Sequence, residues 1–265
     1  MKSIFALIGG AALLVIAGCG GGQNASSISG NYALQGNLTQ GGGTFLGGPL
    51  IGSGSNITGG FHILDSNQCF DPAANVAVSG SLGSGGKITI NTAAAQAQTF
   101  QITATVSADG STISNGTYKV TGGCAAGLTG SIAGFRVDPF TGSYSGTLTV
   151  ADIVGNPTGV QFAATADLTQ AASADANGYF AVSGPVAINS ACFTGFQLAG
   201  SQIFGTQAVF VLTPNAAPAT AGSPALTLNI YATDATAKTI SGNYTAANMT
   251  DPTCNSSGFV ALAHP

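Results

Sequence analysis

The stretch STISNGTYKVTGGC occupies residues 111–124, and KTISGNYTAANMTDPTC occupies residues 238–254. Both run from Thr-Ile-Ser through a glycine and a tyrosine to a cysteine, Cys124 in the first stretch and Cys254 in the second. The two stretches lie about 130 residues apart. A repeating unit of that length is too long for a solenoid, whose repeats span about 20–50 residues. The similarity therefore indicates that a whole domain has been duplicated.

Other short stretches repeat in the same order. Ser-Gly-Asn-Tyr at residues 29–32 corresponds to Thr-Gly-Ser-Tyr at residues 141–144. Ser-Asn-Gln-Cys-Phe at residues 66–70 corresponds to Asn-Ser-Ala-Cys-Phe at residues 189–193. The chain of 265 residues is long enough for two domains of ordinary size, and these matches predict two tandem copies of one domain.

Apolar and polar residues alternate over long parts of both copies, as residues 100–107 illustrate. Phe100 and Ile102 face one way in an extended strand, whereas Gln101 and Thr103 face the other. Polar residues on the second face are typical of antiparallel sheets that cover a core on one side. Turn signals such as Asp109-Gly110 separate the runs and favour hairpin connections.

This pattern predicts an all-β protein with eight strands in each copy, each copy being an antiparallel meander closed as a barrel or flattened toward a sandwich. The first domain is expected over residues 28–137 and the second over residues 138–265. The expected strands of the first domain lie near residues 31–38, 44–50, 55–63, 74–83, 87–92, 100–107, 112–120 and 130–136. Those of the second domain lie near residues 144–152, 160–168, 179–188, 196–205, 208–214, 225–234, 239–248 and 259–263.

Four cysteines follow the duplication: Cys69, Cys124, Cys192 and Cys254. Of the three pairings that four cysteines allow, only Cys69–Cys124 with Cys192–Cys254 respects the repeat. In a meander the loops after strands three and seven lie at the same end, and a disulfide needs Cα atoms within about 7 Å. Either these loops fold over the barrel mouth, or the barrel is flattened. The alternative is four free or metal-binding thiols, which the absence of any Cys-x-x-Cys pair disfavours.

The N-terminal residues have a charge and hydropathy pattern of their own. Lys2 precedes an apolar stretch over residues 3–18, which is shorter than the about 20 residues of a spanning helix. The stretch ends in Ile16-Ala17-Gly18-Cys19, which resembles the lipobox of bacterial lipoproteins. The resemblance covers residues 1–19 only. The alternative is an ordinary signal peptide with an incidental cysteine.

The lipobox resemblance implies that residues 1–18 are removed and that Cys19 receives a diacylglyceryl group on its sulfur and an acyl chain, such as palmitate, on its new N-terminus. Several acyl chains give stable anchoring, where one chain is marginal. Residues 19–27 are then the lipidated cysteine and a flexible tether. By analogy with the family, Gly20 favours the outer membrane, if the organism has one. We therefore expect a protein of the cell envelope.

Composition leaves few groups for chemistry. The net charge is −4, only 5% of residues are charged, and the chain has two histidines. This balance excludes the basic surface that binds nucleic acid. His62 and Asp65 form one candidate pair of base and orienting group, although a strand-end histidine beside a turn aspartate explains them as well. His264 is expected to be frayed at the C-terminus.

Two short motifs are incomplete. Asp-Ala-Asn-Gly at residues 175–178 resembles part of a calcium loop but lacks its other acids. The glycine-rich residues 41–55 lack the lysine of a phosphate-binding loop. The sequence therefore predicts no metal, no cofactor and no catalytic residue.

Tyrosines recur beside glycines at matching places in the two copies: Tyr32, Tyr118, Tyr144 and Tyr244. A Gly-x-Tyr at the start of an eight-strand meander is loosely similar to the opening of calycin barrels. This similarity covers three residues in each copy and carries over no functional residue.

The function expected from these observations is that of a membrane-anchored, exported lipoprotein that is not an enzyme. It would bind a protein, a glycan or a small apolar ligand, or it would structure the envelope. One alternative is a carrier that holds a small apolar ligand inside a calycin-like barrel. The other alternative is an envelope hydrolase with an unrecognised site near His62.

Overall fold

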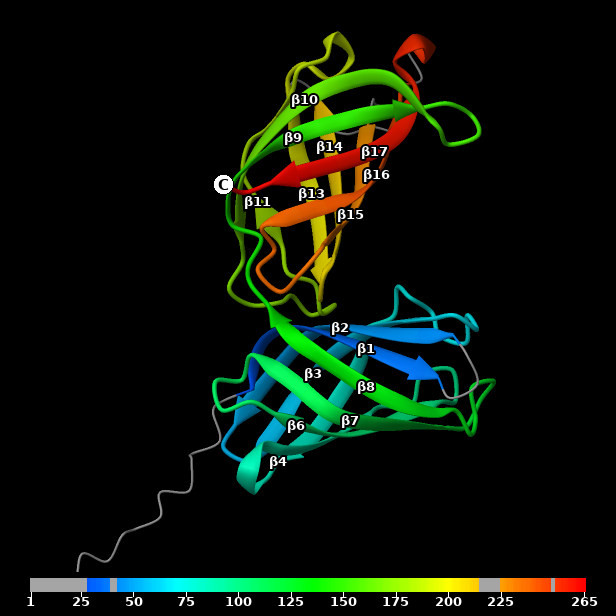
Figure 1. Ribbon diagram of the computed structural model, residues 1–265, viewed down its shortest axis with the longest axis vertical. Helices are drawn as coiled ribbons and strands as arrows, with labels where there is room; N and C mark the ends of the chain where they lie inside the picture. The colour runs from blue at the N-terminus through cyan, green and yellow to red at the C-terminus, as the bar shows by residue number, and fades with distance from the viewer. Residues whose placement is uncertain (1–27, 39–41, 215–224, 249–250) are drawn as a thin grey trace, which may run out of the picture.

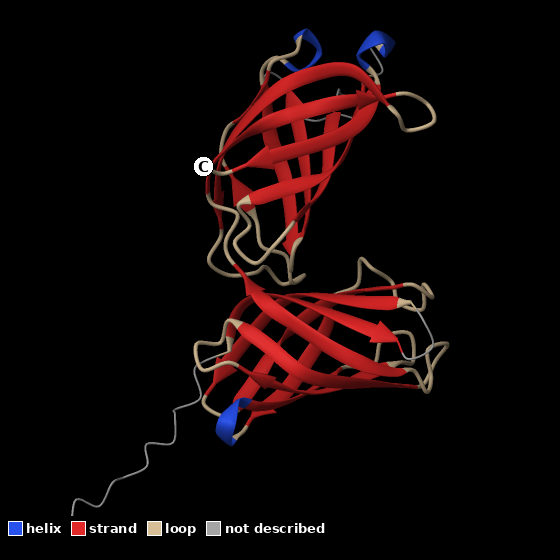
Figure 2. Cartoon of the chain, viewed as in Figure 1, coloured by secondary structure: helices blue, strands red, loops and turns tan. Residues whose placement is uncertain are grey.

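The computed structural model describes residues 28–38, 42–214, 225–248 and 251–265. The expected signal peptide at residues 1–18 and the expected anchor and tether at residues 19–27 lie outside the described residues. Two antiparallel β-barrels follow each other along the chain and lie one above the other in Figures 1 and 2. The predicted fold class is therefore confirmed, whereas the exact domain boundary stays a prediction. Within the described residues, no helix has the length and apolarity needed to cross a membrane.

The first barrel is closed. Its strands pair in chain order, and β1 also pairs with β8, so that the sheet has no free edge. The strands are β1 (Ser29–Leu38), β2 (Gly43–Ser53), β3 (Asn56–Asp65), β4 (Val76–Leu82), β5 (Lys87–Thr92), β6 (Thr99–Val106), β7 (Thr112–Thr121) and β8 (Thr129–Val137). A short 3-10 turn, η1 (Ser84–Gly86), connects β4 to β5.

The second barrel is nearly closed. Its strands are β9 (Gly142–Ala151), β10 (Pro157–Gln170), β11 (Val182–Ser183), β12 (Val186–Ile188), β13 (Phe196–Phe204), β14 (Gln207–Pro214), β15 (Ala225–Ala232), β16 (Thr239–Ala247) and β17 (Ser256–Ala263). The sheet order is β11-β10-β9-β17-β16-β15-β14-β13, and β12 also pairs with β10. Two 3-10 turns, η2 (Ala191–Phe193) and η3 (Pro252–Cys254), lie in its loops.

The predicted single strand at residues 179–188 was wrong, because it is split into β11 and β12. Gly184 has a φ of +132°, which favours glycine, and a Cβ there would lie 1.8 Å from the Asp167 carbonyl oxygen. Pro185 follows and cannot donate a backbone hydrogen bond, although its carbonyl accepts from Asp167 N. Between the described residues, the hydrogen bonds from the split strand to β13 are a bridge between Phe180 and Ile203 and the bonds of Ser201 Oγ to the Val182 backbone. A seam therefore stays open between β12 and the start of β13.

Buried apolar side chains form a core inside each barrel. A tyrosine at the matching position of each copy makes a buried hydrogen bond to the backbone of a distant turn. The Tyr32 hydroxyl donates to the Gly110 carbonyl at 2.6 Å, and the Tyr144 hydroxyl donates to the Ala237 carbonyl at 2.9 Å. Burial raises the pKa of each of these two tyrosines to about 12. The same contact recurs at the matching position of each copy, since each tyrosine lies two residues after the glycine near the start of its repeat. These tyrosines are therefore core residues that tie the first strand to a distant turn.

Both predicted cysteine pairs are present as disulfides. Cys69 and Cys124 have Cα atoms 5.9 Å apart, and Cys192 and Cys254 have Cα atoms 5.4 Å apart. In the first barrel the loop folds over the mouth, because Phe70 beside Cys69 is buried and its ring lies 5.2 Å from that of Phe100. Phe193, beside Cys192, is buried in the same way.

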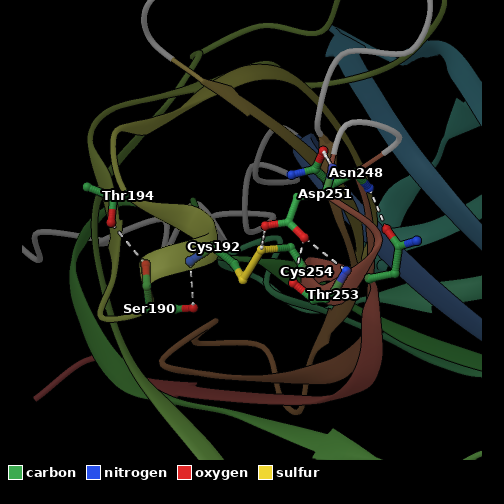
Figure 3. Close-up of a disulfide and its surroundings, with 8 residues drawn as sticks. Ser190, Cys192, Thr194, Asn248, Asp251, Thr253 and Cys254 are labelled. Atoms are coloured by element: carbon green, nitrogen blue, oxygen red, sulfur yellow. Dashed lines mark hydrogen bonds between the residues drawn. A yellow bond between two sulfur atoms is a disulfide. The ribbon is translucent and has the colours of Figure 1, made fainter.

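Figure 3 shows how the second disulfide joins two short turns. The Ser190 hydroxyl accepts from Cys192 N at 3.3 Å, and the Asp251 carboxylate accepts from Thr253 N at 3.1 Å. Each cysteine thus lies in a 3-10 turn whose first backbone donors are capped by a side chain.

Candidate functional site: the junction between the barrels

Two stretches of the first barrel are buried on both faces. In β1 the alternation predicts that Tyr32 and Leu34 face the core, yet Asn31 and Ala33 on the other face are also buried. In β3 the same holds for His62, which lies between the core residues Phe61 and Ile63 and has no exposed surface. The second barrel covers this outer face, as Figure 1 indicates for β1 and β2.

The side chain of Asn31 hydrogen-bonds to the backbone of the second barrel. Its side-chain amide donates to the Gly205 carbonyl at 2.8 Å, and its side-chain oxygen accepts from Gly205 N at 2.7 Å. Gly205 lies in the β13–β14 hairpin, which packs closely on β2: a Cβ at Gly47 would lie 2.8 Å from the Phe204 carbonyl oxygen. The buried pair of hydrogen bonds fixes the position of this hairpin on the first barrel.

His62 makes the second set of contacts between the two barrels. Its ring stacks on Tyr179 at 4.2 Å between centroids and lies 4.9 Å from the ring of Phe204. Its Nε2 lies 3.0 Å from the Asn177 carbonyl oxygen, in the second barrel, and its Nδ1 lies 3.2 Å from the Pro72 carbonyl oxygen. Both carbonyls are acceptors, so a neutral ring with one N–H can donate to only one of them.

The candidate pair of His62 and Asp65 is not assembled. The Asp65 carboxylate accepts from the backbone N–H groups of Cys69 and Phe70, at distances of 2.9–3.2 Å. The two ring nitrogens of His62 face backbone carbonyls instead. His62 also lies within β3 and not at its end, so the expectation of a strand-end histidine was wrong.

Burial lowers the pKa of His62 from its ordinary value of 6.5. The carbonyls of Asn177 and Pro72 and the charge of Asp175 act in the opposite direction but do not outweigh it. The folded protein therefore holds a neutral imidazole at the junction at neutral pH.

We predict that acidification destabilises the wild-type protein through His62. Below about pH 6.5 the unfolded chain binds a proton at this residue that the folded chain resists, so the free energy of unfolding falls as pH decreases. In His62→Gln this contribution disappears, because glutamine does not titrate. Denaturant unfolding between about pH 7 and pH 5 measures the slope of both proteins. An equal slope in both would contradict the assignment.

A cleft of about 810 Å³ lies beside the junction, and both barrels line it. Its floor is the outer face of β2, β1 and β8, where Gln35 pairs across the strands with Phe45 and Ala133. Its wall comes from the β13–β14 turn and the end of β15, where Gln207 pairs with Tyr231. Ligand pockets commonly lie at such domain interfaces and span about 300–1,000 Å³.

The junction fixes the shape of this cleft. Phe45 is partly buried against the core of the second barrel, with its ring 6.4 Å from that of Phe204. Phe135 is also partly buried against that core. Since the same hairpin is held by Asn31, the floor and the wall of the cleft are kept in register by the contacts of the junction.

Other groups singled out in the sequence lie elsewhere. His264 is not frayed, because its ring packs edge-on against Tyr144 with centroids 5.5 Å apart. At residues 175–178 the Asp175 carboxylate accepts from the backbone of Asn177 and Tyr179, which is a plain turn. In the described ranges, no three His, Cys, Asp or Glu side chains gather where they could hold a metal ion.

The sequence reasoning missed the cleft. Its lining residues come from five separate parts of the chain, near residues 35, 45, 134, 206 and 231. One signal was present: the adjacent apolar residues Ile63-Leu64 and Tyr32-Ala33-Leu34 interrupt the alternation, which indicates strands covered on both faces.

No family model, no curated protein and no solved structure matches this chain.

Proposed function

We propose that this protein is an exported, lipid-anchored binding module without catalytic activity, and that its ligand binds in the cleft between the barrels. The observation that carries the proposal is that side chains of both barrels line one cleft of about 810 Å³. The buried hydrogen bonds between Asn31 and Gly205 support it further, because they keep the cleft preorganised.

The chemistry of the junction supports binding over catalysis. Catalysis needs a nucleophile or an acid–base group held near a partner and open to substrate. His62 is fully buried, and its two ring nitrogens face backbone carbonyls. Its role is to join the barrels. The hydrolase alternative therefore loses the residue on which it depended.

Export is supported by two disulfides, which are typical of proteins outside the cytoplasm. Anchoring through acylated Cys19, and location at the outer membrane, rest on the lipobox resemblance of residues 1–19. A tether over residues 20–27 would hold the barrels close to the membrane surface.

One observation favours the carrier alternative. A cavity of about 820 Å³ opens at the seam between β12 and β13 and is lined by residues 184–191 and 193–198. Its largest apolar side chains, Phe193 and Phe196, are buried in the core. The surface left for a ligand is therefore mainly backbone and small side chains, which makes the inter-barrel cleft the better site.

The non-catalytic part of the proposal predicts that the purified wild-type protein turns over none of a set of envelope glycans, esters and peptides. The matched variant is His62→Ala, which removes the one candidate base. Turnover by wild type that this variant loses would overturn the proposal. Turnover that both proteins share would place an active site elsewhere and would overturn it equally.

A further inference from the structure

We propose that the ligand of the inter-barrel cleft is an uncharged glycan. This inference rests on the proposed function, because it names the ligand class of the same site. Three properties of the described lining residues carry it: aromatic surface on two sides, side-chain amides with no hydrogen bond to another described residue, and the absence of charged side chains.

Aromatic side chains face the cleft from both barrels. Phe45 and Phe135 lie on its floor, and Tyr231 lies on its wall. Tyr231 is 44% exposed, which leaves its ring available to a ligand. Sugar rings present C–H groups on their faces, and aromatic rings bury such surface at low entropic cost, since they have only two side-chain torsions.

Two side-chain amides line the same cleft. Gln35 is on β1, beside Phe45 across the strands, and Gln207 is on β14, beside Tyr231. Neither amide has a hydrogen bond to another described residue. Each offers two donors and an acceptor, which suits hydroxyl groups that both donate and accept. The hydroxyl group of Thr206 lies in the same lining.

Charge decides between ligand classes. Among the described residues that line the cleft, none is Asp, Lys, Arg or His. Burying an ionic ligand here would leave its charge unpaired, which is unfavourable. A purely apolar ligand would cover the amides of Gln35 and Gln207 without replacing their hydrogen bonds to water. A neutral, hydroxyl-rich ligand with apolar ring faces satisfies both kinds of lining.

The test uses residues 20–265, which lack the acylated Cys19, exported behind an ordinary cleavable signal peptide so that the protein is soluble. Calorimetric titration uses neutral tetrasaccharides of glucose, mannose, galactose and N-acetylglucosamine, a tetrasaccharide of galacturonic acid, and palmitate. We expect at least one neutral tetrasaccharide to bind. Tyr231→Ala should weaken that binding by about tenfold or more, because it removes an aromatic wall.

The matched control is Phe259→Ala, because Phe259 is 41% exposed on the outer face of the same barrel and does not line the cleft. It should change the affinity by less than about twofold. Gln35→Ala, which alters no aromatic ring, should also weaken binding. Thermal unfolding of each variant separates lost binding from lost folding.

The outcomes distinguish the ligand class from the proposed function. Suppose palmitate or the galacturonic acid tetrasaccharide binds, that Tyr231→Ala abolishes this binding, and that no neutral sugar binds. The glycan inference is then overturned, while binding in the cleft stands. If no probe binds in a way that Tyr231→Ala weakens, both the glycan inference and the cleft as the binding site are overturned.

Discussion

Cells that produce Cys19→Ser are expected to incorporate no labelled palmitate into this protein, whereas wild type incorporates it. Serine offers no thiol to accept the diacylglyceryl group. Without acyl chains, each worth about 0.8 kcal/mol per buried CH₂, the processed chain has no anchor and is expected in the soluble fraction. The expected effect of Cys19→Ser is a complete loss of labelling.

The precursor needs a separate control, because Cys19→Ser is expected to keep its apolar residues 3–18 when lipoprotein processing is blocked. Residues 1–19 are therefore replaced, in a second variant, by an ordinary cleavable signal peptide. This variant should be soluble after cell fractionation, whereas Gln23→Ser in the same tether should stay in the membrane fraction. Equal membrane association of Cys19→Ser, the signal-peptide variant and Gln23→Ser would contradict the anchoring proposal.

Removal of one disulfide is expected to lower the free energy of unfolding by about 4 kcal/mol, through the greater entropy of the unfolded chain. The disulfides close loops with sequence separations of 55 for Cys69–Cys124 and 62 for Cys192–Cys254. Each double substitution to alanine is compared with wild type by guanidinium unfolding under oxidising conditions. A loss below about 1 kcal/mol would show that the loops are held without the bond.

Removal of each disulfide should increase local opening in a different part of the protein. The first barrel is closed by hydrogen bonds around its whole circumference, and its mouth is also plugged by Phe70. The second barrel has an open seam, and Cys192 lies in η2 at the end of this seam. We therefore expect faster amide exchange along β12 and β13 after removal of Cys192–Cys254.

Local patterns were sufficient to predict the architecture. Alternation of apolar residues, as at Phe100 and Ile102, predicted strands whose ends agree with the structure to within a few residues. The repeated Cys-Phe pairs at residues 69–70 and 192–193 predicted which loops meet, and each phenylalanine is buried next to its disulfide. These features depend on residues close together in the sequence or on the repeat itself.

The remaining features depend on how the two copies differ. Gly184-Pro185 interrupts a strand that is continuous in the first copy, and a proline inside a strand was a signal for such a break. His62 has Pro185 opposite it when the copies are aligned without gaps on their cysteines. Its burial comes from the neighbouring barrel, which no pattern within the first copy encodes. The cleft is likewise formed by residues such as Gln35 and Tyr231, about 200 positions apart.

The central claim is that the ligand binds between the two barrels and not inside either of them. Backbone amide chemical-shift mapping of residues 20–265 tests it most directly, during titration with the tightest binder among neutral tetrasaccharides, galacturonic acid tetrasaccharide and palmitate. The account predicts that the largest shifts fall at Gln35, Phe135 and Tyr231, which belong to different barrels but line one cleft. Largest shifts along the seam at residues 186–198, with the cleft unchanged, would contradict it and would indicate a carrier instead.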